Sequence, residues 1–205
     1  TANAYTRLQP LLVDHPAEVL LATRDLLTAI TGVQLHRGGL ALVERGPEPT
    51  LEDVLHPNMR RIVLLEDVTN PDNVGSIFRT ARAFGVDAVV MSPGCADPLY
   101  RKTVRVSLGA ALLVPWARDP AWPASAARLR TMGFVIAALT PTPAAVDIET
   151  FVARGLPPRL AVLLGNEGVG LSDGARQCAD VEVAIRMATG VESINVADTA
   201  AIALH

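Results

Sequence analysis

The sequence has little cysteine, with only 2 in 205 residues. Cys95 and Cys178 lie far apart, and neither belongs to a Cys-x-x-Cys pair or a nearby histidine cluster. Disulfide frameworks need several cysteines, and structural zinc sites need closely spaced cysteines or histidines, so the sequence favours neither. We expect both cysteines to be small buried or half-buried apolar residues, and we expect no metal.

Long hydrophobic runs are also missing. Apolar runs such as 62–65 and 160–164 have the length of strands, whereas a membrane-spanning helix needs about 20 apolar residues. No charged and then apolar leader opens the sequence. Since 50% of the residues are hydrophobic, a sizeable core is available, and we expect a soluble cytoplasmic protein.

Basic charge is not in excess, because the formal net charge is −3 at pH 7. This counts mildly against a nucleic-acid partner, whose phosphates usually attract a basic surface. Lysine occurs only at position 102, so the other basic residues are arginines, whose planar guanidinium suits phosphate oxygens. A general bias of the genome towards arginine explains this preference equally well. Six arginines gather in one stretch: Arg60, Arg61, Arg79, Arg82, Arg101 and Arg105.

The dinucleotide fingerprint Gly-x-Gly-x-x-Gly is absent. Residues 165–170 space their glycines as Gly-x-x-Gly-x-Gly, and only a short helix is expected to follow them. This difference disfavours an oxidoreductase that uses a nicotinamide dinucleotide.

From residue 60 onward, strand-like and helix-like stretches alternate. Such alternation predicts an α/β domain with a parallel sheet and crossover helices on both faces. We expect strands at 61–66, 86–91, 112–116, 134–139, 160–164 and 181–187, and helices at 72–84, 99–108, 124–132, 172–178 and 193–205.

The first 45 residues form a separate piece in this interpretation. We expect helices at 4–13 and 25–30 and strands at 18–22 and 35–43. Residues 46–59, which begin with the turn-forming run Gly46-Pro47-Glu48-Pro49, are interpreted as a linker to the main domain at 60–205. So short a first piece is a partial α/β domain at most.

Three segments rich in Gly and Asn follow apolar strands, at 70–79, 164–172 and 185–197. Ligands bind beyond the carboxyl ends of strands in open α/β sheets, so the segments predict one composite pocket. In the first segment, Asn70 is the expected helix cap, Pro71 lies in the first turn, and Gly75 allows close approach of an anion near Arg79. Ser193 is the expected cap of the last helix. The predicted buried stripe of the first helix is Val74, Ile77, Phe78, Ala81 and Phe84.

These segments resemble, in order, the three motifs of the SpoU/TrmH methyltransferases of the SPOUT superfamily. The matching residues are Asn73-x-Gly75-x-x-x-Arg79, Gly165-Asn166-Glu167-Gly168-x-Gly170, and Ile185-x-Met187 with Ser193-Ile194-Asn195. The resemblance extends from about residue 60 to the end. It implies S-adenosylmethionine-dependent 2′-O-methylation of RNA ribose, a deep C-terminal trefoil knot and a homodimer.

The first piece adds a second resemblance. Residues 35–42 resemble the second half of the substrate-binding domain in the ribosomal-RNA branch of that family, which favours ribosomal over transfer RNA. An antibiotic-resistance methyltransferase and a non-catalytic RNA-binding module stay open as alternatives.

The resemblance also implies roles for single residues. Arg186 departs from it, because the family commonly has proline between Ile and Met. The sequence ends at His205, where the family's last helix usually continues, so we expect a missing tail. The implied catalytic residues are Arg79, Asn73, Glu167, Ser193 and Asn195; the implied cofactor-binding residues are Thr140, Gly165, Ile185, Met187 and Ile194; and the expected RNA-binding residues are Arg37, Arg82, Arg101 and Arg105.

Overall fold

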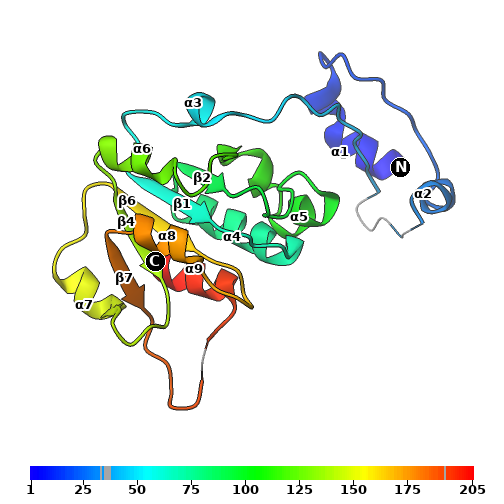
Figure 1. Cartoon of the computed structure of the whole chain (residues 1–205). Helices are drawn as coiled ribbons and strands as arrows, with labels where there is room; N and C mark the ends of the chain where they lie inside the picture. The colour runs from blue at the N-terminus through cyan, green and yellow to red at the C-terminus, as the bar shows by residue number, and fades with distance from the viewer. Residues whose placement is uncertain (33, 35–37, 192) are drawn as a thin grey trace. The chain divides into compact units, whose positions relative to one another are not determined.

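A computed structural model describes residues 1–32, 34, 38–191 and 193–205. The chain divides into two compact units, Thr1–Pro47 and Glu48–His205, and each is described by itself. Figure 1 shows the elements of both units. Among the described residues, no helix combines the length and apolar character that crossing a membrane requires.

The larger unit is built on a seven-stranded sheet in the order β3-β2-β1-β6-β4-β7-β5. Every pair of neighbouring strands is parallel. The predicted α/β class with a parallel sheet is therefore confirmed. The strands are β1 Arg61–Leu65, β2 Ala88–Met91, β3 Trp116–Arg118, β4 Val135–Leu139, β5 Val146–Asp147, β6 Leu160–Leu164 and β7 Val181–Ala184.

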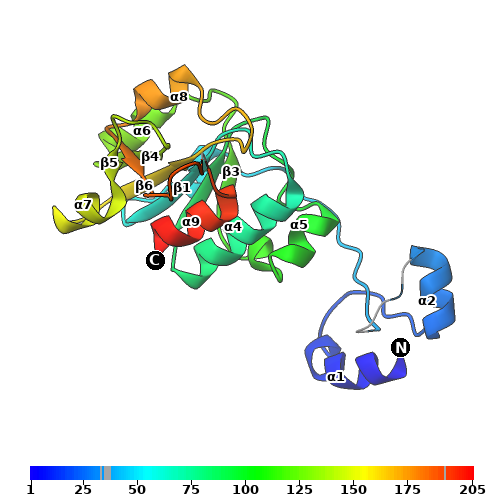
Figure 2. The same cartoon turned by 90° about the horizontal axis from the view of Figure 1, so that it is seen from below.

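Helices cover both faces of this sheet (Figure 2). Successive side chains of a strand point to opposite faces, so Val63 and Leu65 enter one core cluster and Ile62 and Leu64 enter the other. The first cluster is covered by α4 Pro71–Ala83, the 3-10 turn η1 Ala110–Leu112, α7 Ile148–Ala153 and α9 Val196–Leu204, with α5 Arg101–Val106 packed on α4; the second is covered by α3 Leu51–Val54, α6 Ala126–Thr131 and α8 Asp173–Cys178.

Several boundaries differ from the prediction. The sequence pattern missed α3, β5 and α7, and the strand expected at 112–116 begins only at Trp116. The last helix begins at Val196, because the side chain of Asn195 accepts a hydrogen bond from the Ala197 amide. The prediction that Ser193 caps this helix is therefore wrong.

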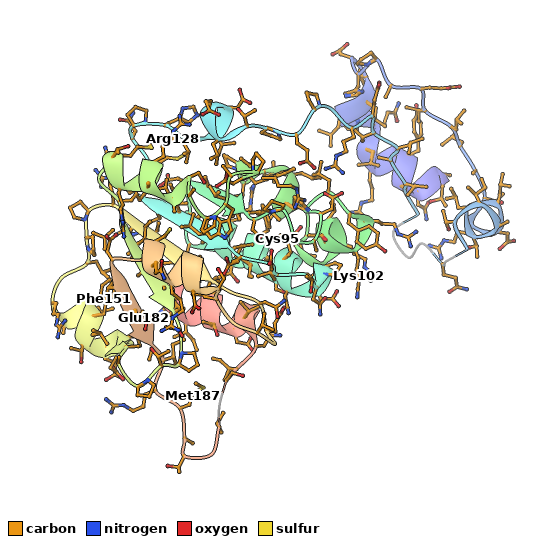
Figure 3. The ribbon with its side chains drawn as sticks, viewed as in Figure 1. Cys95, Lys102, Arg128, Phe151, Glu182 and Met187 are labelled. Atoms are coloured by element: carbon orange, nitrogen blue, oxygen red, sulfur yellow. The ribbon has the colours of Figure 1, made fainter. Side chains whose placement is uncertain are left out.

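Both cysteines are free, as predicted. Cys95 is buried and Cys178 is half-buried. Burial raises the pKa of the Cys95 thiol above its usual value, so it is an unreactive apolar group at neutral pH. Figure 3 labels Cys95 within the larger unit.

The smaller unit, Thr1–Pro47, contains α1 Ala2–Leu12 and α2 Arg24–Thr31. Its described residues form no strand, so the predicted partial α/β domain is wrong for them. Residues 18–22 and 38–43 are irregular, and positions 35–37 lie outside the described residues. Where the structure describes these two apolar runs, neither has a neighbouring strand to pair with, and a lone strand leaves its backbone groups unpaired.

The predicted linker, residues 46–59, is divided between the two units. From Glu48 onward it belongs to the larger unit and includes α3. Val54, Leu55 and Met59 are buried in the second core cluster. The assignment of residues 1–45 to RNA binding stays a prediction.

Gly75 has a packing role that the sequence pattern did not indicate. It is buried in α4, where a Cβ atom would lie 2.8 Å from the Thr103 carbonyl oxygen and 2.9 Å from Val106 Cβ. Both atoms belong to α5, so α4 and α5 meet closely because position 75 has no side chain. The expectation that Gly75 exposes the helix start to an anion is therefore wrong.

Gly75→Ala should destabilise the protein, although Gly-to-Ala changes inside helices usually stabilise them. The added methyl must push α5 away, and overpacking of this kind costs about 1 to 3 kcal/mol. Urea unfolding measures the decrease in the free energy of unfolding. Gly46→Ala is the control, because its Cβ would meet nothing within 4 Å. Equal stability of both variants would contradict the close packing.

Candidate functional site

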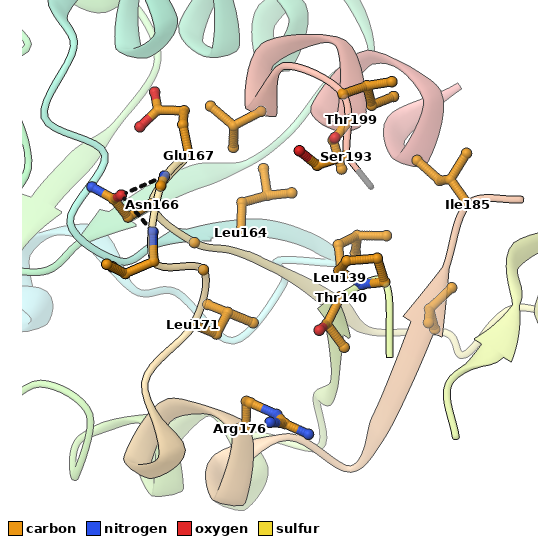
Figure 4. A pocket seen from close by; sticks show the side chains of 18 of the residues that line it. Leu139, Thr140, Leu164, Asn166, Glu167, Leu171, Arg176, Ile185, Ser193 and Thr199 are labelled. Atoms are coloured by element: carbon orange, nitrogen blue, oxygen red, sulfur yellow. Dashed lines mark hydrogen bonds between the residues drawn. The ribbon is translucent and has the colours of Figure 1, made fainter. Parts of the chain in front are cut away.

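A pocket of about 410 Å³ lies where β4, β6 and β7 end (Figure 4). These strands are neighbours in the sheet, so the loops at their carboxyl ends meet at one edge. The walls are mainly apolar, with Leu139, Leu164 and Val183 at the strand ends. All five predicted cofactor-binding residues line it: Thr140, Gly165, Ile185, Met187 and Ile194.

The loop of residues 165–172 forms one wall of the pocket and is shaped by Asn166. Asn166 Oδ1 accepts hydrogen bonds from the Gly168 and Val169 amides at 2.7 and 3.2 Å, and Nδ2 donates to the Asp67 carbonyl at 2.8 Å. A Cβ at position 165 would lie 2.7 Å from the Gly170 carbonyl carbon. The loop therefore folds back on itself only with glycine at position 165.

Three predicted catalytic residues are joined in a chain of hydrogen bonds. The buried Asn73, on the first turn of α4, donates through Nδ2 to Glu167 Oε1. Asn73 Oδ1 accepts from Asn195 Nδ2 at 3.0 Å. Each of the three motifs thus contributes one side chain, and Asn73 connects the other two. We call Glu167, Asn73 and Asn195 the polar chain.

The other predicted catalytic residues lie elsewhere. Ser193 lines the pocket but belongs to no hydrogen bond of the polar chain. Arg79 is exposed on α4 and makes no ion pair with any described residue. Six residues separate it from Asn73, which corresponds to about 9 Å along a helix and about a third of a turn between their directions. Within one chain, Arg79 therefore points away from the polar chain.

The expected RNA-binding residues are surface arginines where the structure describes them. Arg82 is exposed on α4, and Arg101 and Arg105 are exposed on the adjoining α5. Arg37 lies outside the described residues. Arg79 and Arg82 on α4, together with Arg101 and Arg105 on α5, place four exposed guanidinium groups on two helices that pack against each other.

Arg176 is a pocket residue that the sequence analysis missed. Its Nε donates to Glu182 Oε1 at 2.7 Å, and Thr142 Oγ1 donates to Glu182 Oε2 at 2.8 Å. The Arg176 and Thr142 hydrogen bonds lower the pKa of Glu182, and Glu182 raises the pKa of Arg176. Both groups therefore stay charged at neutral pH. Figure 4 shows Arg176 and Glu167 on opposite sides of the pocket; Figure 3 labels Glu182 on β7 and Met187 on the loop beyond it.

Arg186, where the family commonly has proline, forms an ion pair with Asp147 at 3.3 Å. This pair links the loop after β7 to β5. Because the Arg186 side chain is 79% exposed, the pair contributes little to stability. No cluster of three or more His, Cys, Asp or Glu side chains suited to a metal ion occurs in the described ranges.

Comparisons with known proteins agree on one family. Residues 60–205 match the profile described as the SpoU rRNA Methylase family. An "Uncharacterized tRNA/rRNA methyltransferase" of Mycobacterium tuberculosis is 44% identical over 90% of this chain and 64% of its own length. This chain thus spans less than two thirds of that relative. A "23S rRNA (guanosine-2'-O-)-methyltransferase" of Nitrosomonas europaea is 32% identical over 91% of this chain and 71% of its own length.

Solved structures resemble the chain as well. The SpoU methyltransferase AviRb of Streptomyces viridochromogenes, in complex with AdoMet, has a TM-score of 0.74 and 25% identity over 96% of this chain and 75% of its own. An AdoMet-bound rRNA methyltransferase of Sinorhizobium meliloti has a TM-score of 0.79 at 24% identity, covering 98% of this chain and 76% of its own. The second likeness concerns the fold alone.

Asn73→Asp should make stability depend on pH in a defined direction. The new carboxylate would face Glu167, and two carboxylates in one site raise the pKa of the pair. The penalty, about 1 to 3 kcal/mol at pH 7, should shrink as the pH falls through that raised pKa, because one carboxyl is then protonated and donates again. Urea unfolding at pH 7 and at a pH below that pKa measures the change.

Asn58→Asp is the control, because Asn58 is exposed on a turn. A penalty of equal size at both pH values would show that Asn73 does not face a carboxylate.

Proposed function

Because the chain belongs to the SpoU rRNA methylase family, we propose that it transfers a methyl group from S-adenosylmethionine to a ribose 2′-hydroxyl of RNA. The observation that carries this proposal is the pocket beside the polar chain. Loops from three motifs line or border one cavity, and the Glu167 carboxylate belongs to both the cavity wall and the polar chain. Ligand binding and positioning of a second reactant therefore meet at one residue.

The pocket has the properties that S-adenosylmethionine requires. Its volume of about 410 Å³ is in the range of small-molecule sites. Apolar side chains of Ile185, Met187 and Ile194 would cover the adenine, and the backbone groups of Thr140 and Gly165 would supply hydrogen bonds. When bound, the cofactor supplies a methyl group already activated by its sulfonium. Glu167 and Arg176 would face its cationic and anionic groups.

The task left to the protein is to hold the ribose hydroxyl and assist loss of its proton. Guanidinium does not normally deprotonate in proteins, so Arg79 is a poor general base. Since Arg79 points away from the polar chain within one chain, we propose that Arg79 of a second copy in the homodimer fixes a neighbouring phosphate and stabilises the developing alkoxide. Asn73 and Glu167 hold the ribose side of the site, and Ser193 and Asn195 fix the geometry of the loop before α9.

We further propose that the substrate is ribosomal RNA rather than transfer RNA. Support comes from the name of the N. europaea relative, a 23S rRNA methyltransferase, and from the resemblance of residues 35–42 to a ribosomal-RNA branch. The exposed Arg82, Arg101 and Arg105 would bind RNA phosphates. Cytoplasmic localisation fits this substrate.

A homodimer and a trefoil knot complete the proposal. Helices α4 and α9 pack against each other, and two apolar residues beside them, Phe84 at the C-cap of α4 and Ile202 in α9, are 43% and 45% exposed. The predicted burial of Phe84 is therefore wrong for the single chain, and a second copy would cover it. The knot rests on the family resemblance alone.

Light scattering should give the mass of a dimer at micromolar concentration, and a uniform monomer would contradict the proposed homodimer.

Calorimetric titration tests the choice of cofactor. S-adenosylmethionine should bind saturably, with NAD as the matched control that should give no heat, because the dinucleotide fingerprint is absent. Methyl incorporation into ribosomal RNA fragments, followed by mapping of the 2′-O-methyl position, tests the reaction. Saturable NAD binding without S-adenosylmethionine binding would overturn the proposal.

Arg79→Ala should abolish most methyl transfer while folding and cofactor affinity stay nearly unchanged. The side chain is exposed, so the stability change should stay within about 0.5 kcal/mol. Loss of a charge at a developing oxyanion should lower the rate about 10²- to 10³-fold. Arg79→Lys should rescue little, because lysine lacks the planar fork.

Tritiated methyl incorporation, cofactor titration and thermal melting are measured for each variant. Arg154→Ala is the control, because Arg154 is exposed at the end of α7 and lies outside the motifs. Near-normal turnover by Arg79→Ala would remove Arg79 from the mechanism.

A further inference from the structure

Glu66, the first residue after β1, carries a carboxylate that is almost fully buried, with 5% of the residue exposed. Its Oε1 accepts hydrogen bonds from Trp122 Nε1 at 2.8 Å and Ser172 Oγ at 2.7 Å. Its Oε2 accepts from the Ser172 amide at 2.7 Å. Within the described part of the chain, no cation pairs with it. Three donors therefore stabilise this buried charge by themselves.

These contacts reach both ends of the pocket loop, residues 165–172. The Glu66 amide donates to the Leu164 carbonyl at 2.9 Å, directly before the loop begins. The Glu66 side chain holds Ser172, where the loop ends and α8 begins. The carbonyl of the next residue, Asp67, accepts from Asn166 Nδ2 at 2.8 Å. Two consecutive residues thus hold the loop at its beginning and its end.

We propose that Glu66 is a positioning residue that holds loop 165–172 in the shape that binds S-adenosylmethionine, an inference that rests on the proposed function. Glu66 neither lines the pocket nor belongs to the polar chain. It acts through the loop, whose residues from Gly165 to Leu171 form a pocket wall.

The choice of a carboxylate supports a role in positioning. Burying an apolar side chain of similar volume would cost less free energy than burying a charge that has no cation beside it. An apolar side chain would not accept hydrogen bonds from the amide and hydroxyl of Ser172, however. Without them, the end of the loop is free to move away from β1, because the remaining hydrogen bonds, made by Asn166 and Glu167, hold only the glycine-rich segment before it.

Trp122 separates this role from a general role in stability. Its indole binds the same carboxylate but belongs to the segment between β3 and α6, not to the loop. Trp122→Phe therefore removes one donor and leaves both bonds between Glu66 and Ser172. Glu66→Gln keeps the volume, but its single acceptor oxygen cannot serve both Ser172 groups and Trp122.

The experiment measures the Kd and KM for S-adenosylmethionine, kcat and thermal stability in the full chain. Glu66→Gln and Ser172→Ala should each raise Kd and KM about 10-fold, because each removes a hydrogen bond to a buried charge. At saturating cofactor, kcat should stay within about twofold, since bound cofactor holds the loop in place. The variant that combines Glu66→Gln with Ser172→Ala should bind S-adenosylmethionine no more weakly than whichever single variant has the higher Kd. Trp122→Phe should melt earlier but keep a normal Kd.

Normal cofactor affinity in folded Glu66→Gln and Ser172→Ala would overturn the inference and leave the proposed function intact. A Trp122→Phe variant that loses as much affinity as Glu66→Gln would also overturn it, since loss of stability alone would then explain the effect. Should Glu66→Gln fail to fold, Ser172→Ala and Trp122→Phe decide the question. Failure of the unaltered protein to bind S-adenosylmethionine would overturn the proposed function itself.

Discussion

The parallel pairing of β1 with β6 is the constraint on which the site depends. Its register joins Arg61 to Leu160 and Leu65 to Leu164, at the centre of the sheet. This pairing closes a long loop, the chain between β1 and β6. Closing it costs chain entropy, which burial of both strands must offset. The pairing brings the ends of the two strands together, so α4 begins beside loop 165–172. With β4 and β7 as the next strands, the remaining walls of the pocket follow.

At the carboxyl ends of the strands, a few polar groups fix the arrangement of the loops, which burial of apolar side chains alone does not specify. Asn73 is buried, and its amide both donates to Glu167 and accepts from Asn195. Neither alanine nor aspartate would satisfy both partners. Glu66 likewise joins several groups through one side chain, since its carboxylate accepts three hydrogen bonds. Such groups stabilise one arrangement of loops rather than the sheet as a whole.

The smaller unit shows how a pattern of hydrophobic residues can mislead. Leu20, Leu21 and Leu42 lie in runs that predict strands, yet they are exposed and irregular. An apolar run becomes a strand only where another strand accepts its hydrogen bonds and a core covers one face. No residue of α1 or α2 is buried, so no such core exists among the described residues of this unit.

The sequence by itself determined what depends on neighbours a few residues away. The cap at Asn70, the proline in the first turn, and the buried stripe of Val74, Ile77, Phe78 and Ala81 all follow from spacing within one helix. The bounds of β6 at 160–164 were also predicted. Only the tertiary structure decided the strand order, the burial of Gly75 under α5 and the exposure of Phe84. The tertiary structure also decided the polar chain, because Asn73 forms hydrogen bonds with residues 94 and 122 positions away. Local propensity acts over single turns, whereas partners at that separation are chosen by which strands pair and which loops the sheet brings together.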